Sequence, residues 1–104
     1  MSIPMQNLTK CSKRELKILG DFWTLELIQA LSDEDKRFSQ LEKELGNISP
    51  TTLTQRLKKL EAQELVLSKK ETIDKISVVY SLTEKGRGIL PVLHQIKVFA
   101  NKYL

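Results

Sequence analysis

The chain has few of the residues that redox, metal and membrane chemistry require. Cys11 is the only cysteine among 104 residues, which excludes an internal disulfide and a thiolate zinc cluster. His94 is the only histidine, so we expect it at a surface or an interface rather than in a metal site. No stretch approaches the ~20 apolar residues of a membrane span, and the first residues lack a basic segment followed by an apolar run. We therefore expect a cytoplasmic, nucleoid-associated protein with no cofactor and no membrane partner.

Groups that could carry catalysis are equally scarce. Neither a glycine-rich phosphate loop nor a paired-carboxylate cleft is recognisable, and Cys11 and His94 form the only nucleophile–base combination. We therefore predict that the chain is not an enzyme. Its length, with 40% hydrophobic and 29% charged residues, predicts a single folded domain over residues 1–104 with a modest core.

Charge is distributed unevenly along the chain, whose net charge is +4. Residues 18–48 carry seven acids against three bases, whereas residues 49–83 have a balance of +2. The two terminal segments, 1–17 and 84–104, each have a balance of +3. An anionic partner for the basic segments and simple solvation of the charges are both compatible with this asymmetry.

Residues 49–65, "SPTTLTQRLKKLEAQEL", predict a helix with a cationic outer face. Leucines at 53, 57 and 60 fall on one stripe that would be buried. Ser49 suits the N-cap, and Pro50 suits the first helical position because its missing donor is not needed there. The opposite face carries hydroxyls, an amide and cations, with no acid before Glu61. Such a face suits an anionic surface.

The elements that precede this helix predict a helix-turn-helix over residues 39–63. We expect helices at about 12–19, ending at Gly20, and at 22–31, capped by Asp21 and followed by the loop "SDEDK". Ser39 and Glu42 have capping-box spacing and predict the start of the next helix. The turn "GNIS" then leads into the helix with the cationic face, although a plain helical hairpin also fits this spacing.

The remaining segments predict a wing and a last helix. The β-branched runs at 65–72 and 76–82, linked around 73–75, predict a β-hairpin. Thr83 is expected to cap a helix that runs to the C-terminus, with Pro91 kinking it or removing one backbone bond. This helix has an apolar stripe that is too long to be buried by this small core alone. The stripe consists of Ile89, Val92, Leu93, Ile96, Phe99, Ala100 and Tyr103. The predicted fold is mainly α with a small β-hairpin wing, a winged helix-turn-helix.

Double-stranded DNA is the partner that these side chains suit. Amide, hydroxyl and guanidinium groups bond base edges in the major groove, so the candidates for base reading are Thr51, Thr52, Gln55 and Arg56. Thr52 and Arg56 could instead lie along the neighbouring helix. Candidates for phosphate contacts are Ser49, Lys58, Lys59, Lys69, Lys70 and Lys75, although any one lysine could simply be solvated.

Three separated motifs resemble the HxlR-type winged-helix transcriptional regulators, which are relatives of the MarR group. They are "LGDFWTLELIQAL", "RFSQLEKELGNISPTTLTQRLKKLEAQELV" and "VVYSLTEKGRGIL", and the resemblance covers about residues 11–100. It implies a bacterial homodimer on a near-palindromic operator, with dimerisation through the first and last helices. The implied interface residues are Leu16, Leu19, Val92, Leu93, Ile96, Phe99 and Tyr103. The alternative is a winged-helix module for protein interaction or non-specific architectural DNA binding.

Cys11 is a candidate redox sensor. Some members of the family that the chain resembles carry a cysteine just before the first helix that senses oxidants or electrophiles. The nearby basic residues are Lys10, Lys13 and Arg14. Together with a helix N-terminus they would favour the thiolate form of Cys11, although an inert thiol is the alternative. Modulation by thiol oxidation or a small effector is compatible with these residues, and so is an inert thiol. The chain departs from the usual family pattern at Ser12, at Phe22, and at Glu64, where relatives usually carry a glycine before the wing.

Overall fold

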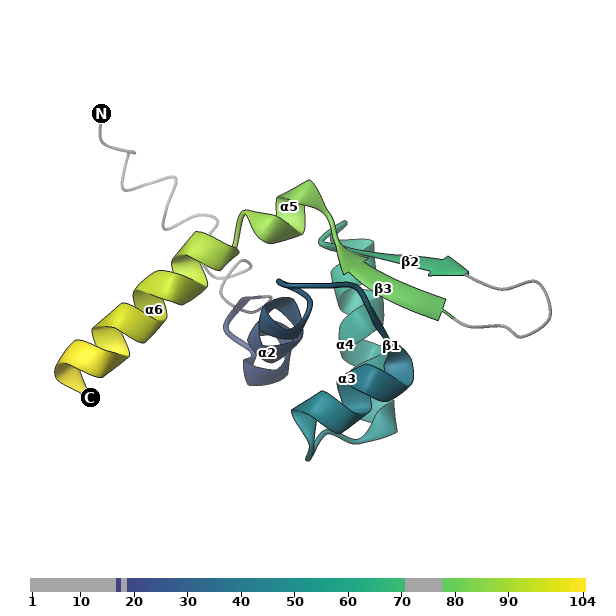
Figure 1. Ribbon diagram of the computed structural model, residues 1–104, viewed down its shortest axis with the longest axis horizontal. Helices are drawn as coiled ribbons and strands as arrows, with labels where there is room; N and C mark the ends of the chain where they lie inside the picture. The colour runs from purple at the N-terminus through teal and green to yellow at the C-terminus, as the bar shows by residue number, and fades with distance from the viewer. Residues whose placement is uncertain (1–16, 18, 71–77) are drawn as a thin grey trace.

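The computed structural model describes residues 17, 19–70 and 78–104, over which five helices and three strands are defined (Figure 1). The elements are α2 (Phe22–Ala30), β1 (Lys36–Arg37), α3 (Phe38–Leu45), α4 (Pro50–Ala62), β2 (Val66–Lys70), β3 (Val78–Leu82), α5 (Glu84–Arg87) and α6 (Leu90–Tyr103). The predicted winged helix-turn-helix is confirmed. No helix in these ranges is both long enough and apolar enough to cross a membrane.

The predicted starts of α2 and α4 are confirmed by their capping bonds. The Asp21 carboxylate accepts a bond of 3.0 Å from the backbone N–H of Thr24, at the start of α2. The Ser49 hydroxyl accepts a bond of 3.1 Å from the backbone N–H of Thr52, and Pro50 is the first residue of α4. The helix predicted at about 12–19 lies almost entirely outside the described residues.

The predicted start of α3 is wrong by one residue, and its predicted capping box is wrong by two. The helix begins at Phe38, and the side chain of Gln40, rather than that of Glu42, accepts a bond of 2.8 Å from the backbone N–H of Arg37. The reason is tertiary: Lys36 and Arg37 pair with β3 as the short strand β1, and the chain enters the helix directly from it.

The wing belongs to a three-stranded antiparallel sheet of order β1-β3-β2. The β2–β3 pairing runs from Val66 opposite Leu82 to Lys70 opposite Val78, which confirms the predicted hairpin over the described residues. The predicted link at 73–75 lies outside the described residues. Between α4 and β2, Glu64 has φ 60°, a left-handed conformation that favours glycine.

The strand β1 is the part of the sheet that sequence reasoning missed, because its polar residues predicted a loop. Lys36 is nevertheless buried. Its Nζ donates 2.6 Å to the carbonyl of Ala30 and lies 2.7 Å from a carboxylate oxygen of Glu44. Burial alone would lower the pKa of Lys36, but the hydrogen bonds and charges of Glu44 and Asp33 together outweigh it and raise that pKa. Lys36 therefore joins the end of α2 to β1 and α3.

The core is formed mainly by leucines of the helices, as predicted for α4. Its fully buried side chains are Leu27, Ile28, Leu31, Leu41, Leu53, Leu57, Leu60 and Val66. Trp23, Phe38 and Leu45 are partly buried and pack against this cluster. Leu93 of α6 belongs to the same cluster.

The single C-terminal helix predicted from Thr83 is divided into α5 and α6. Thr83 does act as a cap, because its hydroxyl accepts a bond of 3.0 Å from the backbone N–H of Gly86. The helix then breaks at Gly88 and Ile89. Pro91 lies in the first turn of α6, where no intrahelical donor is required, so the predicted kink inside a long helix is wrong.

The helix α5 packs closely against the residue that leads into the wing. A Cβ at Gly86 would lie 2.2 Å from the carbonyl oxygen of Leu65, so only glycine fits where α5 contacts the start of the wing. The chain then turns away into α6, which projects from one end of the molecule while the wing projects from the other (Figure 1).

Candidate nucleic-acid interface

The helix-turn-helix is formed by α3, a four-residue turn and α4. Gly46, which ends α3, has φ 67° and so takes the left-handed conformation that the turn requires. Leu53, Leu57 and Leu60 fix one face of α4 in the core. The opposite face of α4 is therefore held outward by packing, and we refer to α4 as the recognition helix.

The outward face of the recognition helix is polar and cationic. As predicted, Thr51, Gln55, Lys58 and Lys59 are exposed, and no acidic residue precedes Glu61 in α4. The exposed hydroxyl and amide groups precede the two lysines along the helix. An array of this kind can bond base edges and, further along, phosphates.

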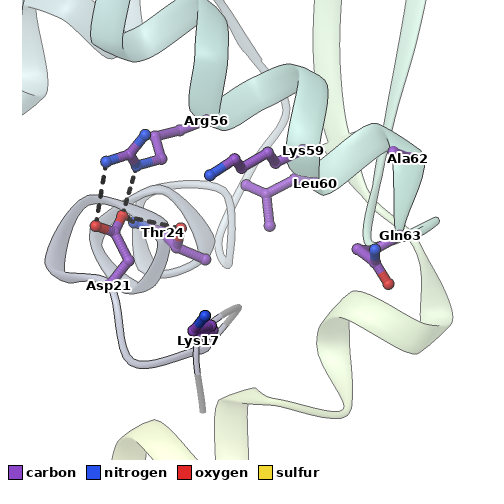
Figure 2. A pocket seen from close by; sticks show the side chains of 8 residues that line it. All are labelled: Lys17, Asp21, Thr24, Arg56, Lys59, Leu60, Ala62 and Gln63. Carbon is purple, nitrogen blue, oxygen red and sulfur yellow. Dashed lines mark hydrogen bonds and ion pairs between the residues drawn. The ribbon is translucent and has the colours of Figure 1, made fainter. Parts of the chain in front are cut away.

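Arg56 lies along the neighbouring helix, which was the alternative to base reading. Its Nε is 2.7 Å from Oδ2 of Asp21 and its Nη2 is 3.3 Å from Oδ1, a two-pronged ion pair between α4 and α2 (Figure 2). This bond from Arg56 is the main cause that lowers the pKa of Asp21; burial opposes it, and the bonds from Thr24 reinforce it. The pair anchors the recognition helix to α2.

Ser49 and Thr52 are engaged at the start of the same helix. The Ser49 hydroxyl donates 2.9 Å to the hydroxyl oxygen of Thr52, in addition to accepting from its backbone N–H. Ser49 is exposed and Thr52 is half-buried. Both side chains therefore belong first to the cap, and the Ser49 oxygen lies at the positive end of the helix dipole, where phosphates bind.

The other predicted interface residues fall in three places. Lys69 and Lys70 are exposed at the end of β2, opposite Val79 and Val78 of β3, whereas Lys75 lies outside the described residues. Leu93 is buried in the core of its own chain, and Leu19 is half-buried and packs against the core. The predicted interface residues that remain exposed on α6 are Val92, Ile96, Phe99 and Tyr103. Cys11 and Leu16 lie outside the described residues.

Behind the recognition helix is a hollow of about 300 Å³ that sequence reasoning did not find (Figure 2). Its lining consists of Lys17, Asp21, Thr24, Arg56, Lys59, Leu60, Ala62 and Gln63. Asp21 was recognised only as a helix cap, because its partner Arg56 is 35 residues away and no local spacing connects them.

His94 is exposed on α6, and the described ranges contain no cluster of three or more potential metal ligands.

The architecture defines a winged helix-turn-helix protein. The chain belongs to the HxlR-like helix-turn-helix family, which it matches over residues 18–104. It is 33% identical to the transcriptional regulator YodB of Bacillus subtilis over 97 residues, which cover 91% of this chain and 87% of that protein. It is 32% identical over 94 residues to YvaP, an uncharacterized regulator of the same organism, covering 88% of this chain and 85% of that one.

Solved structures agree with this assignment. A MarR-family regulator of Porphyromonas gingivalis superposes with a TM-score of 0.83 at 26% identity and full coverage of both chains. The reduced form of YodB superposes with a TM-score of 0.80 at 29% identity, covering 99% of this chain and 95% of that one. The redox regulator HypR, in its reduced form, has a TM-score of 0.80 at 30% identity, covering 88% and 90% of the two chains. The protein is a DNA-binding transcriptional regulator of the HxlR and MarR type.

Proposed function

We propose that the protein regulates transcription as a homodimer that binds a near-palindromic operator sequence-specifically. The observation that carries the proposal is the outward face of α4, which is exposed, cationic and free of acids up to Glu61 while the leucines behind it are buried. In a twofold dimer, two such helices would enter the major groove at half-sites about one helical turn apart.

The exposed apolar stripe of α6 supports the dimer. Val92, Ile96, Phe99 and Tyr103 are each at least 50% exposed in the single chain. Four large apolar side chains on one stripe of one helix are the kind of surface that a second subunit covers. We assign dimerisation to this stripe together with Leu16 and Leu19 of the first helix, while Leu93 supports it from the core.

Within the recognition helix we assign base reading to Thr51 and Gln55, whose side chains are exposed near its start. Arg56 and Thr52 would need to leave Asp21 and Ser49 to reach bases, so we assign them the positioning of the helix. Phosphate contacts fall to Ser49, to the helix lysines Lys58 and Lys59, and to the wing lysines Lys69, Lys70 and Lys75.

Thiol modulation is the second part of the proposal. The structure of YodB has been solved in a quinone-bound form and that of HypR in an oxidized form. Two similar proteins therefore bind a quinone or undergo oxidation. Cys11 is the only thiol of this chain, which limits its oxidation products to an intersubunit or a mixed disulfide and to sulfur oxyacids. Diamide treatment should change the operator affinity of the native protein and not that of a Cys11→Ser variant.

The alternative is a non-specific architectural or protein-interaction module, and one titration separates it from a specific regulator. Fluorescence anisotropy would compare the duplex upstream of the protein's own gene with a scrambled duplex at several salt concentrations. A specific regulator should prefer the native duplex by ~10³ or more, and its affinity should fall steeply with salt. Equal binding to both duplexes would favour the architectural role, and no binding even at low salt would favour protein interaction.

A further inference from the structure

The short helix α5 is fastened by side-chain bonds to the end of the recognition helix α4. The ammonium group of Lys85 donates a bond of 2.9 Å to the carbonyl of Gln63, which is the C-cap residue of α4. The hydroxyl of Thr83 donates a bond of 2.6 Å to the next carbonyl, that of Glu64. The last carbonyls of a helix have no intrahelical donor and carry partial negative charge, so a cationic donor suits this position.

The same short helix is also fastened to the end of α2. The Nη1 of Arg87 donates a bond of 3.3 Å to the carbonyl of Ser32, the residue after the C-cap Leu31. Lys85 and Arg87 are the two basic residues of this four-residue helix, and both are exposed. The helix α5 therefore joins the C-terminal ends of α2 and α4 through one cationic side chain each, and we refer to Lys85 and Arg87 as the α5 clamp.

The connection from α5 to α6 is helical throughout, and it links the wing to the last helix (Figure 1). Gly88 and Ile89 lie between the two helices and both have right-handed helical dihedral angles. Their backbone N–H groups donate to carbonyls of α5 at 3.2 Å. Because no flexible loop separates the two helices, the orientation of α5 is passed on to α6.

Few other contacts define the direction of α6. Leu93 is its buried residue, and Lys97 makes one exposed bond to Gln29 of α2. A hollow of about 220 Å³, lined by Leu90 and His94 among others, lies between α6 and the end of α2. Packing against α2 therefore leaves the angle of α6 incompletely defined, and the attachment of α5 completes it.

We infer that Lys85 and Arg87 are positioning residues that fix the angle between α4 and α6, and that they thereby set the half-site spacing that the dimer accepts. The second part rests on the proposed function, in which α6 joins the subunits and α4 enters the groove. A change of this angle within each subunit moves the two recognition helices of a twofold dimer relative to each other. Their separation must match half-sites about one helical turn apart.

The first test measures the arrangement of the two helices within one chain. Nitroxide labels are attached to Thr54→Cys in α4 and Asn101→Cys in α6, in a Cys11→Ser chain. An excess of unlabelled Cys11→Ser chain ensures that pulsed electron paramagnetic resonance reports intrachain distances. Lys85→Met with Arg87→Met removes both donors but keeps long side chains of similar helix propensity. We expect this double variant to widen the distance distribution about twofold, because α5 is no longer held at both ends.

Matched variants separate the clamp from a general effect on α5. Lys85→Arg with Arg87→Lys keeps a cationic donor at each position and should restore the native distribution. Glu84→Gln changes the charge of the same helix at an exposed residue outside the clamp and should leave the distribution unchanged. The bonds of the clamp face solvent, where water can replace them, so the methionine variant should keep the native circular dichroism spectrum. An unchanged distribution in this folded variant would overturn the inference.

The second test asks whether the clamp sets the half-site spacing. Anisotropy titrations use the duplex upstream of the protein's own gene and duplexes with one base pair added to or removed from the centre of its inverted repeat. For the native protein each change should weaken binding about tenfold or more, because one half-site loses its register with a recognition helix. For the methionine variant this penalty should fall to about threefold or less, because a looser angle accepts more spacings.

The two tests fail in distinguishable ways. If Lys85 and Arg87 only contacted phosphates, their loss would lower affinity equally at every spacing and reduce the salt slope. Spacing penalties that stay at the native value would therefore refute the role in half-site spacing. If the protein stays monomeric or binds no DNA, the proposed function fails, whereas the intrachain distances still decide whether the clamp fixes α6 against α4.

Discussion

The helices α4 and α6 have nearly equal lengths, 13 and 14 residues, but they use their apolar stripes in opposite ways. In α4, Leu53, Leu57 and Leu60 are at most 2% exposed. In α6, Leu93 is the buried residue, while large apolar side chains such as Phe99 remain more than half exposed. The apolar stripe of α4 is buried inside the chain, whereas most of the apolar stripe of α6 is exposed.

The attachments of the two helices differ in the same way. Besides its leucines, α4 is fixed to α2 by the two-pronged Asp21–Arg56 pair, whereas a single exposed bond of 2.8 Å joins Lys97 of α6 to Gln29 of α2. A helix that presents side chains to DNA must be held by its own subunit. A helix that completes a dimer can leave its contacts to the partner.

The largest expected effect comes from opening the core under α4. Leu57→Ala should lower the free energy of unfolding by about 2–5 kcal/mol, because it removes buried methyl groups and leaves a cavity. Urea denaturation followed by circular dichroism measures this change. Thr54→Ala, on the exposed side of the same helix, is the control and should change stability by less than about 0.5 kcal/mol. Comparable effects of the two variants would contradict the assigned faces.

Charging the exposed stripe of α6 should break the proposed dimer and leave the subunit folded. Phe99→Glu places a carboxylate in the proposed interface and should raise the dimer Kd by about 100-fold or more, with light scattering after size exclusion as the measurement. Val98→Glu is the matched control, because Val98 is also exposed but lies on the opposite side of the helix. A dimer that survives Phe99→Glu would move the interface elsewhere.

Removing a proposed base contact should reduce specificity rather than general affinity. Gln55→Ala should cost about 1–3 kcal/mol on the operator and little on a scrambled duplex, because its amide bonds only particular base edges. Lys58→Ala should weaken binding to both duplexes similarly and reduce the salt slope by about 1. Anisotropy titrations of both variants separate these outcomes, and equal losses on both duplexes for Gln55→Ala would refute base reading.

Acid should weaken the anchor of α4. Because the folded pKa of Asp21 is lowered, its stabilising effect is present above the unfolded value near 3.8 and is lost as pH falls through the lower folded value. Asp21→Asn should therefore cost about 1 kcal/mol at pH 7 and progressively less below pH 4. Urea denaturation across pH measures this loss. In an Arg56→Gln background, the cost of Asp21→Asn at pH 7 should be clearly smaller.

The smallest effect concerns the residue that leads from α4 into the wing. Glu64→Gly should stabilise the protein by roughly 0.5–1 kcal/mol, because glycine adopts a positive φ without the penalty of a side chain. Glu61→Gly, inside α4, should instead destabilise it by about 1 kcal/mol. Thermal denaturation of the two variants gives the signs, and destabilisation by Glu64→Gly would show that its side chain has another role.

Predictions from local patterns were the most successful. The leucine spacing of α4, its Ser49–Pro50 start and the Asp21 cap each depend on residues within a turn or two, and the structure confirms all three. Predictions failed where distant segments meet. The helix α3 starts one residue earlier than predicted because β1 pairs with β3, and the predicted last helix is divided at Gly88 and Ile89, just after Gly86 packs against Leu65.

The sequence by itself determined the class of fold, the helix that faces outward and the sign of the charge on it, because periodicity and capping act over a few residues. The tertiary structure alone decided which of those charges are paired within the chain and which are available to a partner. It paired Arg56 with Asp21 across 35 residues and placed Lys59 beside a hollow with Lys17. Ion pairs and cavities depend on which helices lie together in space, and no local spacing records that choice.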